Sequence, residues 1–190
     1  MGKNRLEAFS DGVIAIIITI MVLEMKVPHG DDLAALHSLI PVFISYVLSF
    51  IYVGIYWNNH HHLLHAVQKI NGPILWANLH LLFWLSLLPF VTGWMGENQF
   101  STWPVALYGL VLLMAAIAYS ILELALINLH GKDSQLAKAV GHDFKAKISL
   151  VIYASAIPLS FVSRWFAFSL YVLVALMWVI PDPRIEKKLN

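Results

Sequence analysis

Six long apolar stretches constrain the fold of this chain more than any other feature of its sequence. They cover approximately residues 6–26, 39–62, 73–95, 103–129, 145–163 and 165–180. A helix needs about 20 mostly apolar residues to cross the hydrocarbon core of a bilayer. Only 12% of the residues are charged, whereas a soluble domain has roughly a quarter. We therefore expect an all-α membrane protein with six transmembrane helices, forming a single domain over residues 1–190.

Residues at the ends of these stretches support the boundaries. Pro73 and Pro104 stand at expected first helical positions, and Gly131 follows the fourth helix. A short interfacial helix is predicted over residues 31–38, before the second span. Two acids within the first stretch, Glu7 and Asp11, argue against a cleaved signal peptide.

The distribution of positive charge predicts the orientation. With the N-terminus inside, every lysine and arginine except Lys26 and Arg164 falls on the inner side. Positive residues concentrate in cytoplasmic loops, so we expect both termini in the cytoplasm. The formal net charge of +1 gives no indication of a nucleic-acid partner.

Polar side chains from four of the expected helices fall at one level, the inner third of the membrane. Ionisable groups at this depth usually face partners inside a bundle, so Asp11 is expected to accept a hydrogen bond from Trp57, Asn58 or a histidine of the second helix. One interpretation is a network that only joins helices; another is a proton relay that includes Glu123. The other members of this expected network are Ser10, His61, His62, Asn78 and His80.

Metal and enzyme chemistry find little support in the sequence. His61 and His65 have helical i, i+4 spacing, but three consecutive histidines spread around a helix and do not converge on one ion. The absence of cysteine excludes thiolate sites and disulfides, and no nucleophile motif is present. We expect no enzyme activity, no structural metal and no cofactor.

The first helix has an uninterrupted apolar stripe. At 100° per residue, Asp11 lies about 140° from this stripe, so the acid points elsewhere. Periodicity alone does not distinguish a pore wall from a lipid-facing or packing surface. The stripe comprises Phe9, Gly12, Ile16, Ile20, Leu23 and Val27, with Thr19 at its margin.

The motif Arg5-x-x-x-Phe9-Ser10-Asp11 at the start of this helix resembles the signature of the transmembrane protein 175 family of potassium channels. The likeness extends to six helices, internal termini and a tryptophan-asparagine-histidine cluster at the end of the second helix. This resemblance implies potassium permeation without a carbonyl filter. For a chain with one six-helix repeat, it implies a homotetramer in the plasma membrane of a prokaryote, surrounded by lipid.

The same resemblance implies roles for residues of the first helix. Four copies of this helix would line a central pore, with Ile16 as the constricting aliphatic residue. Ile20 and Leu23 would continue the pore wall outward, and Thr19 would add a ring of hydroxyls. Potassium would pass because it loses its hydration shell more easily than sodium.

Several alternatives remain open at this stage. Residues 91–96, with the sequence VTGWMG, resemble a degenerate carbonyl filter, but they follow a full-length span. A proton-coupled secondary transporter would use Asp11, the histidines and Glu123, and a scaffold without a permeant ion is a third possibility. Arg5 is expected to pair with Glu7 or Asp143, or to stabilise a neighbouring subunit.

Overall fold

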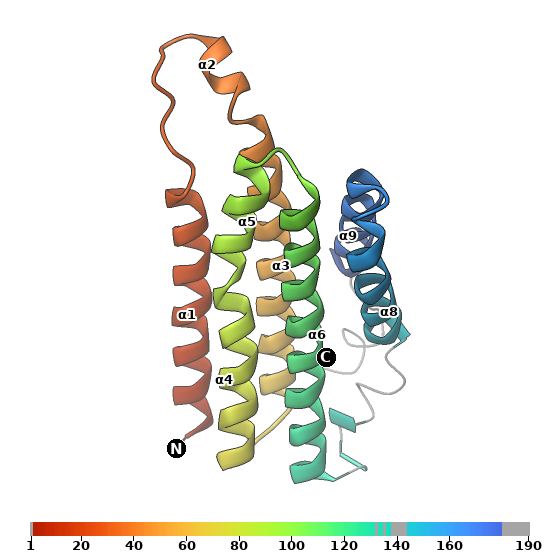
Figure 1. The fold of residues 1–190 in the computed structure, drawn as a ribbon. Helices are drawn as coiled ribbons and strands as arrows, with labels where there is room; N and C mark the ends of the chain where they lie inside the picture. The colour runs from red at the N-terminus through yellow and green to blue at the C-terminus, as the bar shows by residue number, and fades with distance from the viewer. Residues whose placement is uncertain (1, 132, 135, 138–143, 180–190) are drawn as a thin grey trace.

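The computed structural model describes residues 2–131, 133–134, 136–137 and 144–179, and shows a bundle of helices (Figure 1). Each expected apolar stretch corresponds to helix, with ends that differ by a few residues. The bounds are α1 Lys3–Leu23, α2 Leu33–His37, α3 Ile40–His65, α4 Gly72–Ser86, α5 Leu88–Glu97, α6 Thr102–His130, α8 Phe144–Leu159 and α9 Arg164–Val179.

Four helical segments among the described residues are long and apolar enough to cross a membrane. They are Lys3–Leu23, Ile40–His65, Gly72–Glu97 and Thr102–His130. The described parts of α8 and α9 have 16 residues each and border residues outside the described ranges. Six membrane crossings therefore remain a prediction.

Local sequence signals account for the main helix ends. The Asn71 side chain accepts a hydrogen bond from the Ile74 N–H at 3.1 Å, which caps α4 ahead of Pro73. Gly131 follows α6 with a φ of 89°, a conformation that favours glycine. The expected short helix before the second span is present as α2, capped by Asp32.

The third apolar stretch is interrupted beside Pro89, as a proline inside an apolar stretch predicts. It divides into α4 and α5 at Leu87, directly before a helix that carries Pro89 in its first turn. Because proline lacks an N–H donor, the backbone ladder is interrupted at this point. The two helices still run in one direction and form one continuous crossing (Figure 1).

Successive long helices run in opposite directions, so α1 and the α4–α5 segment rise in the figure while α3 and α6 descend (Figure 1). We call the end of the bundle that holds Lys3, His65 and His130 the lower end, as it appears in the figure. The helix α1 packs against α3, α4 and α5, while α8 and α9 form a hairpin that packs against α6 and α3.

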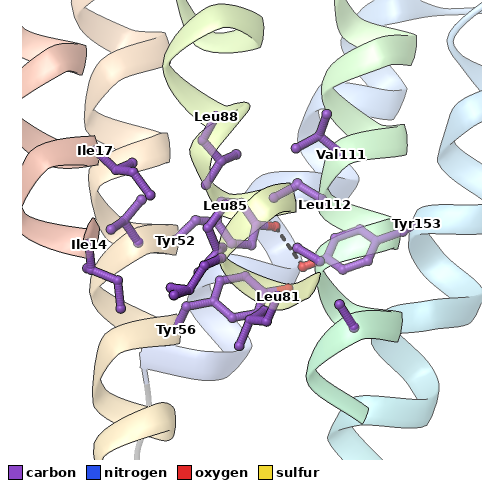
Figure 2. Packing of buried hydrophobic residues seen from close by; sticks show 14 of the residues in the cluster. Ile14, Ile17, Tyr52, Tyr56, Leu81, Leu85, Leu88, Val111, Leu112 and Tyr153 are labelled. Atoms are coloured by element: carbon purple, nitrogen blue, oxygen red, sulfur yellow. Dashed lines mark hydrogen bonds between the residues drawn. The ribbon is translucent and has the colours of Figure 1, made fainter. Parts of the chain in front are cut away.

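Leucine and tyrosine side chains fill the centre of the bundle (Figure 2). Tyr52 on α3 donates to the Tyr171 carbonyl at 2.7 Å and receives a hydrogen bond from Tyr153 at 3.2 Å. Buried hydroxyl groups need such partners because water is absent around them. These bonds therefore connect α3 with both helices of the α8–α9 hairpin.

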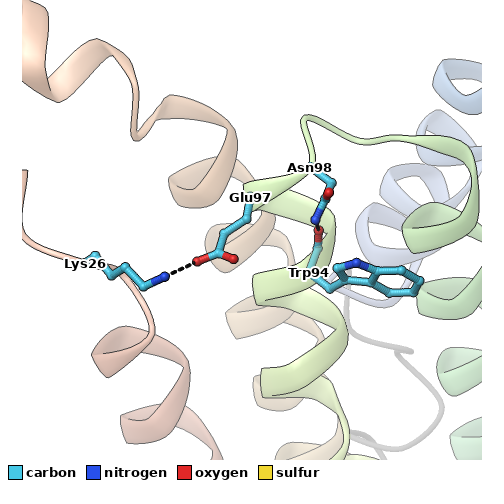
Figure 3. Close-up of polar contacts among 4 residues, drawn as sticks. All are labelled: Lys26, Trp94, Glu97 and Asn98. Carbon is cyan, nitrogen blue, oxygen red and sulfur yellow. Dashed lines mark hydrogen bonds and ion pairs between the residues drawn. The ribbon is translucent and has the colours of Figure 1, made fainter.

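An ion pair joins α1 to α5 near the upper end (Figure 3). Lys26, which follows α1, lies 2.8 Å from the Glu97 carboxylate at the end of α5. This carboxylate raises the pKa of Lys26, mainly through the hydrogen bond between them. Because both groups are exposed, the pair orients the connection more than it stabilises the fold.

Candidate functional site

The helix α1 has one face buried in its own chain and one face free. Ile16 is 57% exposed, Ile20 40% and Leu23 78%, and these three residues lie on the apolar stripe. The opposite face is buried and consists of Leu6, Ser10, Ile14, Ile17 and Met21. Packing within the chain therefore does not explain the stripe, and it is available to lipid or to other subunits.

Thr19 lies beside the stripe with a defined orientation of its hydroxyl group. The Thr19 Oγ1 atom donates to the Ile16 carbonyl at 2.8 Å, and the side chain is exposed. Because the proton is directed toward the backbone, the oxygen lone pairs remain free on the exposed side. Thr19 therefore presents an acceptor oxygen, which suits a cation.

Asp11 lies away from the stripe and contacts α3. The Trp57 indole Nε1 donates to the Asp11 carboxylate at 3.1 Å. Trp57 is one of the donors expected from the sequence, and the structure identifies it among them. Asn58 is exposed and makes no hydrogen bond to any described residue.

A buried chain of polar side chains connects α1, α4 and α3. Ser10 donates to the Leu6 carbonyl at 2.9 Å, and Asn78 donates to the Ser10 hydroxyl at 2.9 Å. The Asn78 carbonyl oxygen then lies 2.7 Å from Nε2 of His60, which acts as the donor in this arrangement. All three side chains are almost completely buried, so the chain holds α1 firmly against its neighbours.

Sequence reasoning missed His60 as a member of this network. The three consecutive histidines look equivalent by composition, and His61 and His62 were the residues expected there. His60 shares a face of α3 with the buried residues Tyr56, Leu63 and Leu64, and this helical periodicity was the signal that distinguished it.

The other histidines occupy different surroundings. His61 lies 3.5 Å from the Glu7 carboxylate and stacks with Trp57 and His65. His62 is half-buried and contacts the His61 ring edge to face. His80 accepts a hydrogen bond from Trp84 on its own helix, so the structure places it outside the chain that joins the helices.

Arg5 is exposed near the lower end of α1. Glu7, one of its expected partners, contacts His61 instead. The other expected partner, Asp143, lies outside the described residues. Within the described part of the chain Arg5 forms no ion pair.

Two further expectations concern α5 and α6. Residues 91–96 lie inside α5, where backbone carbonyls are directed along the helix and do not form a filter. Glu123 is half-buried on α6, and its function stays a prediction.

No group of three or more histidine, aspartate or glutamate side chains that could hold a metal occurs among the described residues.

Comparisons with known proteins agree on one family. The family model described as endosomal/lysosomal potassium channel TMEM175 matches residues 5–89. Over 190 residues the chain is 58% identical to a potassium channel of a Chryseobacterium species, with 100% of this chain and 99% of the relative covered. A potassium channel of Streptomyces collinus is 31% identical over 198 residues, with coverage of 97% and 96%.

A solved structure shares the fold of this chain. It is the crystal structure of a lysosomal potassium-selective channel TMEM175 homolog from Chamaesiphon minutus, with a TM-score of 0.81 and 27% sequence identity. The similarity covers 94% of this chain and 96% of that one. The likeness therefore extends from the α1 motif to the α8–α9 hairpin.

Proposed function

The chain belongs to the TMEM175 family, and we propose that it is a potassium-selective channel in which four copies of α1 surround a central pore. It is an integral membrane protein. The proposed assembly is a homotetramer in the plasma membrane of a prokaryote, with both termini in the cytoplasm and the lower end of the bundle facing inward. Each subunit contributes one channel domain, and the permeant ion is potassium.

The observation that carries this proposal is the free apolar stripe of α1. A helix whose apolar face contributes nothing to its own chain is suited to line an axis shared with identical neighbours. Ile16 is assigned to the narrowest point, and Ile20 and Leu23 extend the wall toward the upper end. The relatives that are named potassium channels support potassium permeation.

Selectivity then arises from the cost of removing water from the ion. A ring of isoleucine side chains offers no ligands, so an ion that passes it loses part of its hydration shell without replacement. Potassium holds its water less tightly than sodium and loses less free energy. A difference of about 1.4 kcal/mol between the two ions gives about tenfold discrimination.

Polar groups beside the stripe complete the proposed pore. The four Thr19 oxygens would stabilise an ion directly above the constriction, because their lone pairs are free. The buried chain of Ser10, Asn78 and His60 would fix the rotation of α1 and so the direction of the stripe. Arg5 would pair with an acid of a neighbouring subunit, since an unpaired ring of positive charge opposes cation entry.

The test is to replace Ile16 with asparagine in the full chain reconstituted into liposomes. Asparagine wets the constriction, so conductance is expected to rise and the preference for potassium over sodium to fall. The measurement is the reversal potential in mixed potassium and sodium solutions. Ile121→Asn is the matched control, since Ile121 is an exposed isoleucine of α6, and it should leave the reversal potential unchanged.

Flux measurements separate the channel from a proton-coupled transporter. Potassium should leak down its gradient to equilibrium with no pH gradient present. Strict dependence of potassium movement on a pH gradient would overturn the channel proposal. An unchanged reversal potential in Ile16→Asn would instead remove only Ile16 as the constriction.

A further inference from the structure

A pocket lies between α3, α6, α8 and α9, on the side of the bundle away from α1. The pocket is partly open, and the empty space within it, including the open side, is about 480 Å³. One water occupies about 30 Å³ in the liquid, so the pocket has room for a small molecule.

The walls of this pocket are predominantly aromatic. None of the described residues that line it has a charged side chain. An ion would lose its hydration here without a compensating partner, so a neutral molecule fits the pocket better. The aromatic lining residues are Tyr52, Tyr56, Tyr119, Tyr153 and Trp178.

One hydroxyl in the wall has no partner. Tyr56 is only 9% exposed, yet its hydroxyl makes no hydrogen bond within the described part of the chain. Its ring is held edge to face against Tyr119, with 6.2 Å between the centroids. Figure 2 shows Tyr52 and Tyr56 extending from α3 toward Tyr153 of α8. The Tyr56 hydroxyl is not among the fully buried atoms that lack a partner, so it is accessible, and a molecule or water bound in the pocket would accept a hydrogen bond from it.

The neighbouring hydrogen-bonding groups are mostly occupied. Tyr52 donates to the Tyr171 carbonyl, Tyr153 donates to Tyr52, and Ser149 receives the Trp178 indole N–H. Asn59 uses its amide N–H to bind the Ile55 carbonyl at 2.9 Å.

The Asn59 amide oxygen makes no bond to any other described residue, so it remains an acceptor. Asn59 stands three residues after Tyr56 on α3, so the two share a helical face. The pocket thus offers one donor and one acceptor close together.

We propose that this pocket binds a neutral alcohol with an aliphatic tail. A hydroxyl group can accept from Tyr56 and donate to Asn59 at the same time. The tail would lie against the apolar side chains that line the pocket, among them Ile55 and Ala116. The site contains no residue of α1, so the proposal does not depend on the proposed channel function.

The test uses heavy-atom quenching of tryptophan fluorescence by 6-bromo-1-hexanol, with the full chain in detergent. Trp178 is a lining residue and one of seven tryptophans, so the difference between the wild type and Trp178→Phe isolates its signal. Saturable quenching of Trp178 is expected, and 1-bromohexane, which lacks the hydroxyl, should bind more weakly.

Two variants change different properties of the pocket: one its hydrogen bonding and the other its size. Tyr56→Phe keeps the ring and removes the hydroxyl, so affinity for the alcohol should fall about fivefold. Ala116→Leu places a larger side chain in the wall and should abolish saturable quenching. Tyr46→Phe and Ala154→Leu are the controls, since Tyr46 and Ala154 lie outside the lining, and both should bind as the wild type does.

Thermal unfolding of each variant, measured without ligand, separates loss of binding from loss of folding. Equal and non-saturable quenching by both bromo compounds would overturn the proposal and leave water as the only occupant. Saturable quenching that persists in a folded Ala116→Leu protein would place the binding site elsewhere.

Discussion

At the scale of single residues, Asn78 has the largest predicted effect on stability. It accepts from His60 and donates to Ser10 in a region closed to water. Replacement by alanine leaves the His60 Nε2 donor without a partner and removes one of the two hydrogen bonds of Ser10, which costs about 2–4 kcal/mol. The measurement is the midpoint of thermal unfolding in detergent, where a clear decrease is expected.

Ser86→Ala provides the comparison for this variant. The Ser86 hydroxyl is exposed and donates only to the Phe83 carbonyl of its own helix, so its loss should cost less than about 0.5 kcal/mol. Equal effects of the two substitutions would show that the buried chain contributes no special stability.

The buried chain of polar side chains also shows which contacts of single residues can be predicted from a sequence. The polar layer was predicted because polar side chains in apolar helices stand out, and Trp57 was among the donors expected for Asp11. The choice of His60 over His61 depends on a rotation of one residue, about 100° around α3. The hydrogen bond from Trp84 to His80 within α4 depends on a side-chain direction that composition does not encode.

At the scale of helices, Gly96 sets how closely α5 approaches α3. A Cβ atom added at Gly96 would lie 2.6 Å from both the Val42 Cα and the Ser45 hydroxyl. The Val42 contact involves backbone, which does not move aside easily. Gly96→Ala should therefore push the two helices apart and destabilise the fold by about 1–3 kcal/mol.

Gly93 offers a matched control on the same helix. A Cβ atom there would meet nothing within 4 Å, so Gly93→Ala should be neutral or slightly stabilising, because alanine favours helix over glycine. Thermal unfolding of the two variants tests the contrast. A stable Gly96→Ala protein would mean that the α3–α5 contact is not as tight as the structure indicates.

The extent of each helix was more predictable than its internal geometry. Apolar length and caps such as Asn71 predicted the spans, since both are local properties. An interruption at Pro89 was predictable, because a proline breaks the backbone hydrogen bonding of a helix. The exact division at Leu87 was not, because Pro89 is compatible with either a kinked helix or a new one. The free face of α1 was also unresolved, since a stripe in the sequence does not reveal what covers it.

At the scale of the whole molecule, the surface of one chain is incomplete. The stripe of α1 is exposed, and so is the polar side chain of Asn58 on α3, which has no hydrogen-bond partner among the described residues. Exposed polar side chains are unfavourable against lipid, whereas contact with another subunit would provide partners. The proposed homotetramer therefore accounts for the apolar and the polar parts of this surface together.

Single cysteines test this assembly directly, because the natural chain contains none. Leu23 is 78% exposed at the upper end of α1, and four copies would surround the axis. A short bifunctional thiol cross-linker applied to Leu23→Cys in membranes should therefore join subunits into dimers on a denaturing gel. Val162 is 84% exposed at the α8–α9 turn, so Val162→Cys should remain monomeric under the same treatment.

The mass of the intact particle completes this test. Native mass measurement of the Leu23→Cys protein should give four chains, because cross-linking at one position joins only pairs. If both cysteine variants cross-link equally, the cross-links form by random collision of chains. This result would contradict a position of α1 next to the symmetry axis. If the particle contains a single chain, the exposed stripe faces lipid, and conduction along it would have no enclosing wall.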